Sequence, residues 1–231
     1  MRGTLIKILI VIAVIALLAG SFFLPNIVAG VADARTLDTL MMREAQGFSF
    51  DSRPKLAVPD RIALVADRSI EALPLNTGRI MDMAAASERA VEELTWFFSG
   101  GPIDFNFDLC LVEEGGAEFI INTYDPSVNL IVWEFTIVDP SKNTFIITLD
   151  DETGVIIKVI YRGAIMSDDR YAAALRLAEM MNDYYGLSIS LADFQMGGDI
   201  AYYKANLTAG DMEIPMYGII RASGFSMNEQ A

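Results

Sequence analysis

The first 25 residues constrain this chain most. Two cations, Arg2 and Lys7, precede an almost unbroken apolar run over residues 8–24, and Pro25 follows it. About 20 residues, counted from Leu5, span the roughly 30 Å hydrocarbon core of a bilayer at ~1.5 Å rise per residue. A run this apolar has no polar face to present to water, which argues against a buried core helix. We therefore expect residues 1–25 to form a transmembrane anchor.

The flanking charges predict the orientation of this segment. Because the nearby cations precede the run, the positive-inside rule places the N-terminus in the cytoplasm and the remaining chain outside it, at the cell membrane as a single-pass protein. A cleaved signal peptide has a similar N-terminal region and remains an alternative, with residues 19–21 as its cleavage site. The apolar run continues beyond that site through Phe22, Phe23 and Leu24, which favours an uncleaved anchor.

Composition excludes several classes of function. The 231-residue chain carries a net charge of −14, contains no histidine and has one cysteine, Cys110. Histidine-dependent catalysis, histidine-ligated zinc and an intramolecular disulfide are therefore impossible. The acidic surface disfavours nucleic acid as a partner. Cys110 falls in the alternating run 105–112, which predicts a small core residue.

Beyond the anchor, the pattern predicts a stalk and a first folded unit. Residues 26–79 are expected to form a juxtamembrane stalk with short helices, one of them around 61–73. Residues 80–163 form the first unit, which begins with a helix over 80–98. β-Branched and aromatic runs separated by Pro, Gly, Asp and Asn then predict antiparallel strands. These strands are expected at 105–112, 117–124, 130–138, 144–149 and 155–161, with a turn at 113–116.

The same order of elements restarts in residues 164–225. Ser167, Asp168 and Asp169 form a helix N-cap, the helix spans 170–185, and Gly186 ends it. Strands are expected at 188–195, 200–207 and 213–221. The predicted fold class is α+β: a transmembrane helix followed by helix-on-antiparallel-sheet units, two in tandem. Whether the two units share one sheet is left open.

Residues 132–159 resemble a known family. The run 133–138, a polar turn, the run 144–149 and then Asp150-Asp151-Glu152-Thr153-Gly154-Val155-Ile156 are similar to the PepSY-type hairpin, with its Asp-x-x-Thr-Gly signature. The anchor and repeated layout resemble membrane-anchored bacterial proteins with PepSY or tandem cystatin-like domains. The resemblance implies an extracytoplasmic binding or regulatory module and carries over no catalytic residues. The signature also has a physical cause, because Asp begins the turn and Gly takes its positive-φ position.

No group of residues predicts a catalytic, cofactor or metal site. The concentrated ionisable groups are acidic pairs and triplets: Glu113-Glu114, Asp150-Asp151-Glu152 and Asp168-Asp169. A calcium site is conceivable at 150–154, but the ligand spacing of an EF-hand loop is missing, and we expect a solvated turn. On a strand, adjacent residues face opposite ways, so one of Tyr202 and Tyr203 should be exposed.

These observations favour a non-enzymatic, membrane-anchored extracytoplasmic module. We expect it to bind a protein or peptide within a membrane complex, with the membrane itself as a partner and no cofactor. Two alternatives remain. One is a small-molecule carrier with a cavity between helix and sheet. The other is a carboxylate-based hydrolase of cell-envelope polymers.

Overall fold

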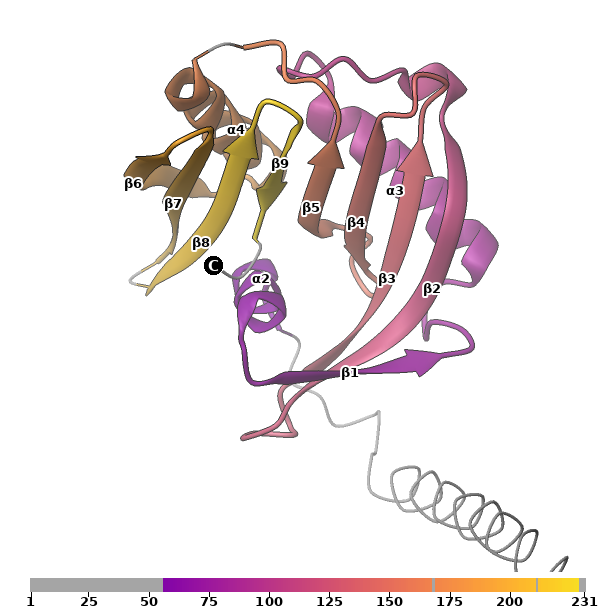
Figure 1. The fold of residues 1–231 in the computed structure, drawn as a ribbon. Coiled ribbons are helices and arrows are strands. Elements are labelled where there is room, and N and C mark those ends of the chain that lie inside the picture. The colour runs from indigo at the N-terminus through magenta and orange to yellow at the C-terminus, as the bar shows by residue number, and fades with distance from the viewer. Residues whose placement is uncertain (1–55, 168, 211, 229–231) are drawn as a thin grey trace, which may run out of the picture. The chain divides into compact units, whose positions relative to one another are not determined.

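The computed structural model describes residues 56–167, 169–210 and 212–228, all within one compact unit (Figure 1). In chain order, its elements are α2 (Val58–Ala66), β1 (Ile70–Leu75), α3 (Met83–Phe98), the 3-10 turn η2 (Phe107–Leu109), β2 (Leu111–Asn122), β3 (Asn129–Val138), β4 (Thr144–Asp150), β5 (Ile156–Arg162), α4 (Arg170–Tyr185), β6 (Ser188–Gly197), β7 (Ile200–Ala209), β8 (Met212–Arg221) and β9 (Gly224–Met227).

The nine described strands form one continuous antiparallel sheet in the order β1-β2-β3-β4-β5-β9-β8-β7-β6. The expected fold class, α+β with helix-on-sheet units in tandem, is therefore wrong. A single large sheet with three helices dominates the described residues. Strands β2 to β5 form one meander and β6 to β9 form another, and the last strand of each pairs with the last strand of the other.

Strand β9 joins the two meanders into one sheet, and the sequence pattern did not predict this strand. The strand has only four residues, two of them Gly224 and Ser226, so it lacks the alternating β-branched pattern of a strand. It pairs with Val159–Arg162 of β5 on one side and with Gly218–Arg221 of β8 on the other. Its backbone groups therefore close the hydrogen-bond ladder between the two meanders.

The segment expected to be a stalk with a helix at 61–73 instead contains α2 and the edge strand β1. Pro59 lies in the first turn of α2, where a missing N–H costs no hydrogen bond. Pro74 is tolerated in β1 because β1 pairs only with β2 and lies at the edge of the sheet. Helix α2 contacts β5 and β8, and it lies below the end of β9, in the gap that this short strand leaves (Figure 1).

The longest described helices, α3 and α4, have 16 residues each, and no helix of the described part is long and apolar enough to cross a membrane. The predicted anchor at 1–25, and the predicted stalk up to residue 55, lie outside the described residues.

The predicted strand at 105–112 and turn at 113–116 are also wrong. Residues 107–109 form η2, and β2 runs through the expected turn with a register shift between Val112 and Glu114. Of the two glycines that suggested a turn, Gly115 and Gly116, the first has a packing role. A Cβ at Gly115 would lie 2.4 Å from the ring of Phe135, so this strand position accepts no side chain without repacking.

Helices α3 and α4 cover one face of the sheet, with α3 against β2–β5 and α4 against β6–β8 (Figure 1). Helix α4 has the predicted ends: Asp169 accepts the N–H groups of Tyr171 and Ala172, and Gly186 ends the helix at φ +62°. The helices meet where the rings of Phe97 and Tyr184 stack, with centroids 4.2 Å apart.

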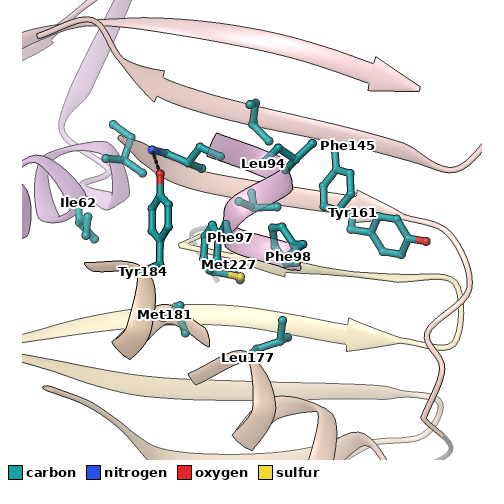
Figure 2. Close-up of a cluster of buried hydrophobic side chains, with 14 of the residues drawn as sticks. Ile62, Leu94, Phe97, Phe98, Phe145, Tyr161, Leu177, Met181, Tyr184 and Met227 are labelled. Carbon is teal, nitrogen blue, oxygen red and sulfur yellow. Dashed lines mark hydrogen bonds between the residues drawn. The ribbon is translucent and has the colours of Figure 1, made fainter. Parts of the chain in front are cut away.

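The core between helices and sheet is built from large side chains that lie against one another (Figure 2). Phe98 of α3 packs on Phe145 of β4 with ring centroids 5.0 Å apart, and on Phe225 of β9 at 5.7 Å. The ring of Tyr161 lies 5.4 Å from that of Phe225, across the junction between the two meanders. The junction is therefore held by aromatic packing as well as by strand pairing.

Two adjacent tyrosines of α4 bind the backbone of β5. The N–H of Ile156 donates to the hydroxyl oxygen of Tyr184 at 2.8 Å, and the hydroxyl of Tyr185 donates to the carbonyl of Ile156 at 2.8 Å. Tyr184 in turn donates to buried Glu93 of α3 at 2.5 Å. Helix α4, which precedes the second meander, thus provides hydrogen-bond partners for both backbone groups of a residue in the first meander.

These buried hydroxyls predict loss of stability at alkaline pH. Burial, followed by the negative charges of Asp139 and Asp104, raises the pKa of Tyr161 to about 12. Burial also raises the pKa of Tyr184, Tyr185 and Tyr203. The folded state keeps protons that the unfolded chain releases near pH 10, so this stabilisation is complete below about pH 10 and is lost above it.

We expect the free energy of unfolding to fall above pH 10 by up to about 1.4 kcal/mol per pH unit for each of these hydroxyls. Denaturant titrations between pH 8 and pH 12, read by circular dichroism and tyrosinate absorbance, measure this fall. Tyr161→Phe should make the fall less steep between pH 10 and pH 12. Full ionisation of all eight tyrosines with native circular dichroism would contradict the prediction.

Candidate functional site

Asp150, expected on a solvated turn, is completely buried at the end of β4. Its carboxylate forms an ion pair with Nη1 of Arg61 at 2.7 Å and accepts the backbone N–H of Thr153 at 2.8 Å as well as that residue's hydroxyl. Arg61, itself only 4% exposed, also pairs with Glu152 and donates from Nε to the carbonyl of Leu56. The ion pair therefore fixes α2 to the turn after β4.

Asp151 points to the opposite face of the sheet and is 2% exposed. Its Oδ1 accepts the indole N–H of Trp133 at 2.8 Å, and its two oxygens accept the backbone N–H groups of residues 79–81 at 2.8–3.1 Å. A Cβ at Gly78 would lie 2.1 Å from the same Oδ1, so the loop before α3 can approach this closely only with glycine. The solvated-turn prediction is wrong for both aspartates, which hold two elements to the sheet from opposite sides.

The geometry predicted for the turn itself is confirmed. Asp150 begins it, accepting the N–H of Thr153 and, through its carbonyl, the N–H of Gly154 at 2.8 Å. Gly154 has φ +69°, a conformation that β-branched residues avoid. The Asp-x-x-Thr-Gly signature therefore has a structural role in this chain.

The other residues singled out by sequence do not come together. Glu113 and Glu114 are exposed on β2, Asp169 caps α4, and Asp168 lies outside the described residues. Cys110 is half-buried against the core and donates its thiol to the carbonyl of Phe107 at 3.3 Å. Burial, followed by the charges of Asp139 and Asp108, raises the pKa of this thiol, which disfavours the reactive thiolate.

The sheet face opposite α3 and α4, here called the open face, carries exposed aromatic and charged side chains. Tyr203 is buried under the helices and Tyr202 is 45% exposed on the open face, as strand alternation predicts. Tyr217, two strand positions from Ile219, lies on the same face and is 38% exposed. Alternation places four cations on this face of the central strands: Lys158, Arg162, Lys204 and Arg221.

A trough runs along β9 on the open face, because β9 presents smaller side chains to this face than its neighbours β5 and β8 do. The register places Arg162, Gly224 and Arg221 in one row across β5, β9 and β8. The next row is formed by Ile160, Ser226 and Ile219. Gly224 and Ser226 therefore form the floor, with one isoleucine and one arginine in each wall, and the hollow has a volume of about 430 Å³.

The floor of the trough is fixed by close backbone approach and internal hydrogen bonds. A Cβ at Gly224, whose φ is +142°, would lie 2.0 Å from the carbonyl oxygen of Tyr161. The Ser226 hydroxyl oxygen accepts the N–H of Ile219 at 3.2 Å, and its carbonyl accepts the hydroxyl of Tyr203 at 3.0 Å. The trough is therefore a built feature of the sheet.

The charges around the trough are cationic in an acidic protein. No acidic residue among those described forms an ion pair with Arg162 or Arg221, although Arg61, Arg89 and Arg176 are all paired. The acids of the open face lie away from this position: Glu114 and Glu118 on β2, Glu134 on β3, Asp150 buried at the end of β4, Asp193 on β6, and Glu213 at the far end of β8. Arg162 of β5 and Arg221 of β8 are therefore both exposed to solvent beside Gly224.

Sequence reasoning missed the trough because it depends on β9. Arg162 and Arg221 are far apart in the chain, and nothing in their local sequences connects them. The available signal was the pair Gly224 and Ser226 one turn after a strand, which is compatible with a return strand but does not require one.

The described residues contain no group of three or more acidic or cysteine side chains that could hold a metal ion. Comparison of the chain with protein-family models, with characterised proteins and with solved structures finds no significant match. The PepSY resemblance therefore stays a prediction.

The Asp151 network generates a stability prediction. Asp151→Ala leaves the indole N–H of Trp133 and the backbone N–H groups of residues 79–81 without their acceptor. We expect unfolding to become easier by about 3–5 kcal/mol. The matched control, Asp183→Ala on the exposed side of α4, should change stability by less than about 0.5 kcal/mol. Denaturant midpoints measure both values, and equal midpoints for the two variants would contradict the assigned role.

Proposed function

We propose that this protein is a non-enzymatic, membrane-tethered binding or regulatory module that uses the open face of its sheet to bind a protein or peptide within a membrane complex. The apolar run at residues 8–24 supports attachment to the membrane, with the folded domain outside the cytoplasm. The observation that carries the proposal is the open face, where exposed tyrosines, half-buried isoleucines and two arginines with no ion-pair partner among the described residues lie together on one sheet.

The composition of this face fits protein recognition. Tyr202 and Tyr217 supply large apolar area with a polar tip, and tyrosine and arginine are enriched at the energetic centres of interfaces. The half-buried isoleucines Ile160 and Ile219 supply apolar surface between them. The strands hold these side chains in fixed register, so little order has to be gained on binding.

Two features favour binding over the alternative functions. The buried acids of the described part, Glu93, Asp139, Asp150 and Asp151, all accept hydrogen bonds within the fold, which leaves them poorly suited to a hydrolase. The space between helices and sheet is filled by stacked rings such as Phe97 and Tyr184, which argues against a carrier cavity there.

Site-specific photo-crosslinking in native membranes tests the proposal. A benzophenone amino acid replaces Tyr202 or Tyr217 in the full chain, and Tyr171 provides the matched control. Tyr171 is 49% exposed, close to the 45% of Tyr202, but it lies on α4. A second control, Tyr124, is 87% exposed in the β2–β3 turn.

We expect a discrete protein adduct from the two open-face positions at a yield at least about tenfold above that from either control, since interface aromatics dominate contact. Equal yields from open-face and control positions, or adducts only from Tyr171, would show that the partner binds elsewhere.

A further inference from the structure

We propose that the trough along β9 binds an extended acidic segment of a partner protein, with Arg162 and Arg221 holding one of its carboxylates over Gly224. This inference names the chemistry of the partner and therefore rests on the proposed function.

The row of Arg162, Gly224 and Arg221 provides the geometry. Neighbouring strands lie about 4.8 Å apart, so the Cα atoms of the two arginines, one strand removed from each other, are separated by roughly 9.6 Å. Gly224 between them has no side chain to occupy the space above it. A planar guanidinium can donate two parallel hydrogen bonds to a carboxylate, and two guanidiniums can approach one carboxylate from both sides.

The electrostatics favour an anionic occupant. The chain carries a net charge of −14, yet the described residues leave both arginines without an ion-pair partner. The acids on the same face lie at least two strands from β9 or at the opposite end of β8. A partner carboxylate would therefore meet local positive charge within a surface that otherwise repels it, which restricts binding to this place.

The shape favours an extended peptide. Ile160 and Ile219 form apolar walls behind the arginines, and Ser226 continues the floor, so the trough follows the direction of β9. Four strand residues span roughly 13 Å, enough for the alternating side chains of a short extended segment. A membrane surface fits less well, because the acidic domain is repelled by anionic lipid.

Fluorescence anisotropy with the full-length protein in detergent micelles tests the inference. The probe is a fluorescein-labelled peptide of Glu-Val repeats, and the matched peptide replaces every Glu by Gln. The test variant is Arg162→Gln/Arg221→Gln, and the control is Arg176→Gln, which removes an exposed charge on α4. An Arg162→Lys/Arg221→Lys variant keeps both charges and provides the comparison if the Gln variant loses its fold.

We expect the Glu-Val peptide to bind the unmodified chain and the Arg176→Gln control about tenfold or more tightly than it binds the Gln variant, since charge-assisted bidentate pairs are lost. The Gln-Val peptide should bind about as weakly as that variant does, and the Lys variant should lie between. Three results would overturn the inference: equal affinity of the unmodified chain for both peptides, equal affinity of the Gln variant and the unmodified chain for the Glu-Val peptide, or no binding of the Glu-Val peptide.

Two competitors separate the other occupants. If inorganic phosphate or phosphatidylglycerol vesicles bind the trough with higher affinity than the peptide and displace it, the peptide assignment is overturned. Failure of the trough is distinguishable from failure of the proposed function. Crosslinks from Tyr202 that persist while the peptide fails to bind would leave the open face as the interface and remove the acidic segment.

Discussion

The ladder between β5 and β9 holds the two meanders of this protein in one sheet, because no other strand pair of the described residues crosses between them. This pairing depends on a close approach of two backbones at Gly224, where any side chain would collide with the carbonyl of Tyr161. The aromatic contacts of Phe225 with Phe98 and Tyr161 then pack the same junction from the helical side. One short strand thus determines both the continuity of the sheet and the trough on its open face.

Several further contacts connect parts of the chain that are distant in sequence. Tyr184 and Tyr185 of α4 satisfy both backbone groups of Ile156 at the start of β5. The Asn228 side chain, directly after β9, donates to the carbonyls of Ile62 in α2 and of Ile157 in β5. The Asn228 hydrogen bonds thus connect the end of β9 to α2 and β5, and α2 itself contacts β5 and β8. These contacts therefore stabilise the helix-covered face of the sheet and the end of the sheet near α2.

Local sequence patterns predicted the local elements well and their assembly poorly. The bounds of α4, its cap at Asp169 and the strands from 129 to 162 follow from capping residues and alternation, which act over a few residues. The strand through Glu113–Gly116 was missed because Gly115 accommodates the ring of Phe135, a contact invisible in local sequence. Asp150 and Asp151 looked like turn residues exposed to water. Only their distant donors, Arg61 and Trp133, explain their burial.

The open face could be predicted only in part. Alternation identified Tyr202 as the exposed member of its pair, because that rule needs one strand alone. The row of Arg162, Gly224 and Arg221 needs the register of three strands, one of them unrecognised in the sequence. Sites formed across a sheet by single residues of separate strands therefore remain invisible to local reasoning, even where each side chain is ordinary.

Amide hydrogen exchange of the full-length protein in detergent micelles tests the central role of β9 most directly. If the β5–β9 ladder joins the meanders into one cooperative sheet, its amides should exchange as slowly as the slowest amides of β3 and β4. Rapid exchange of the β9 amides, with β3 and β4 still protected, would show that the two meanders separate readily and would contradict the continuous sheet on which the proposed binding surface depends.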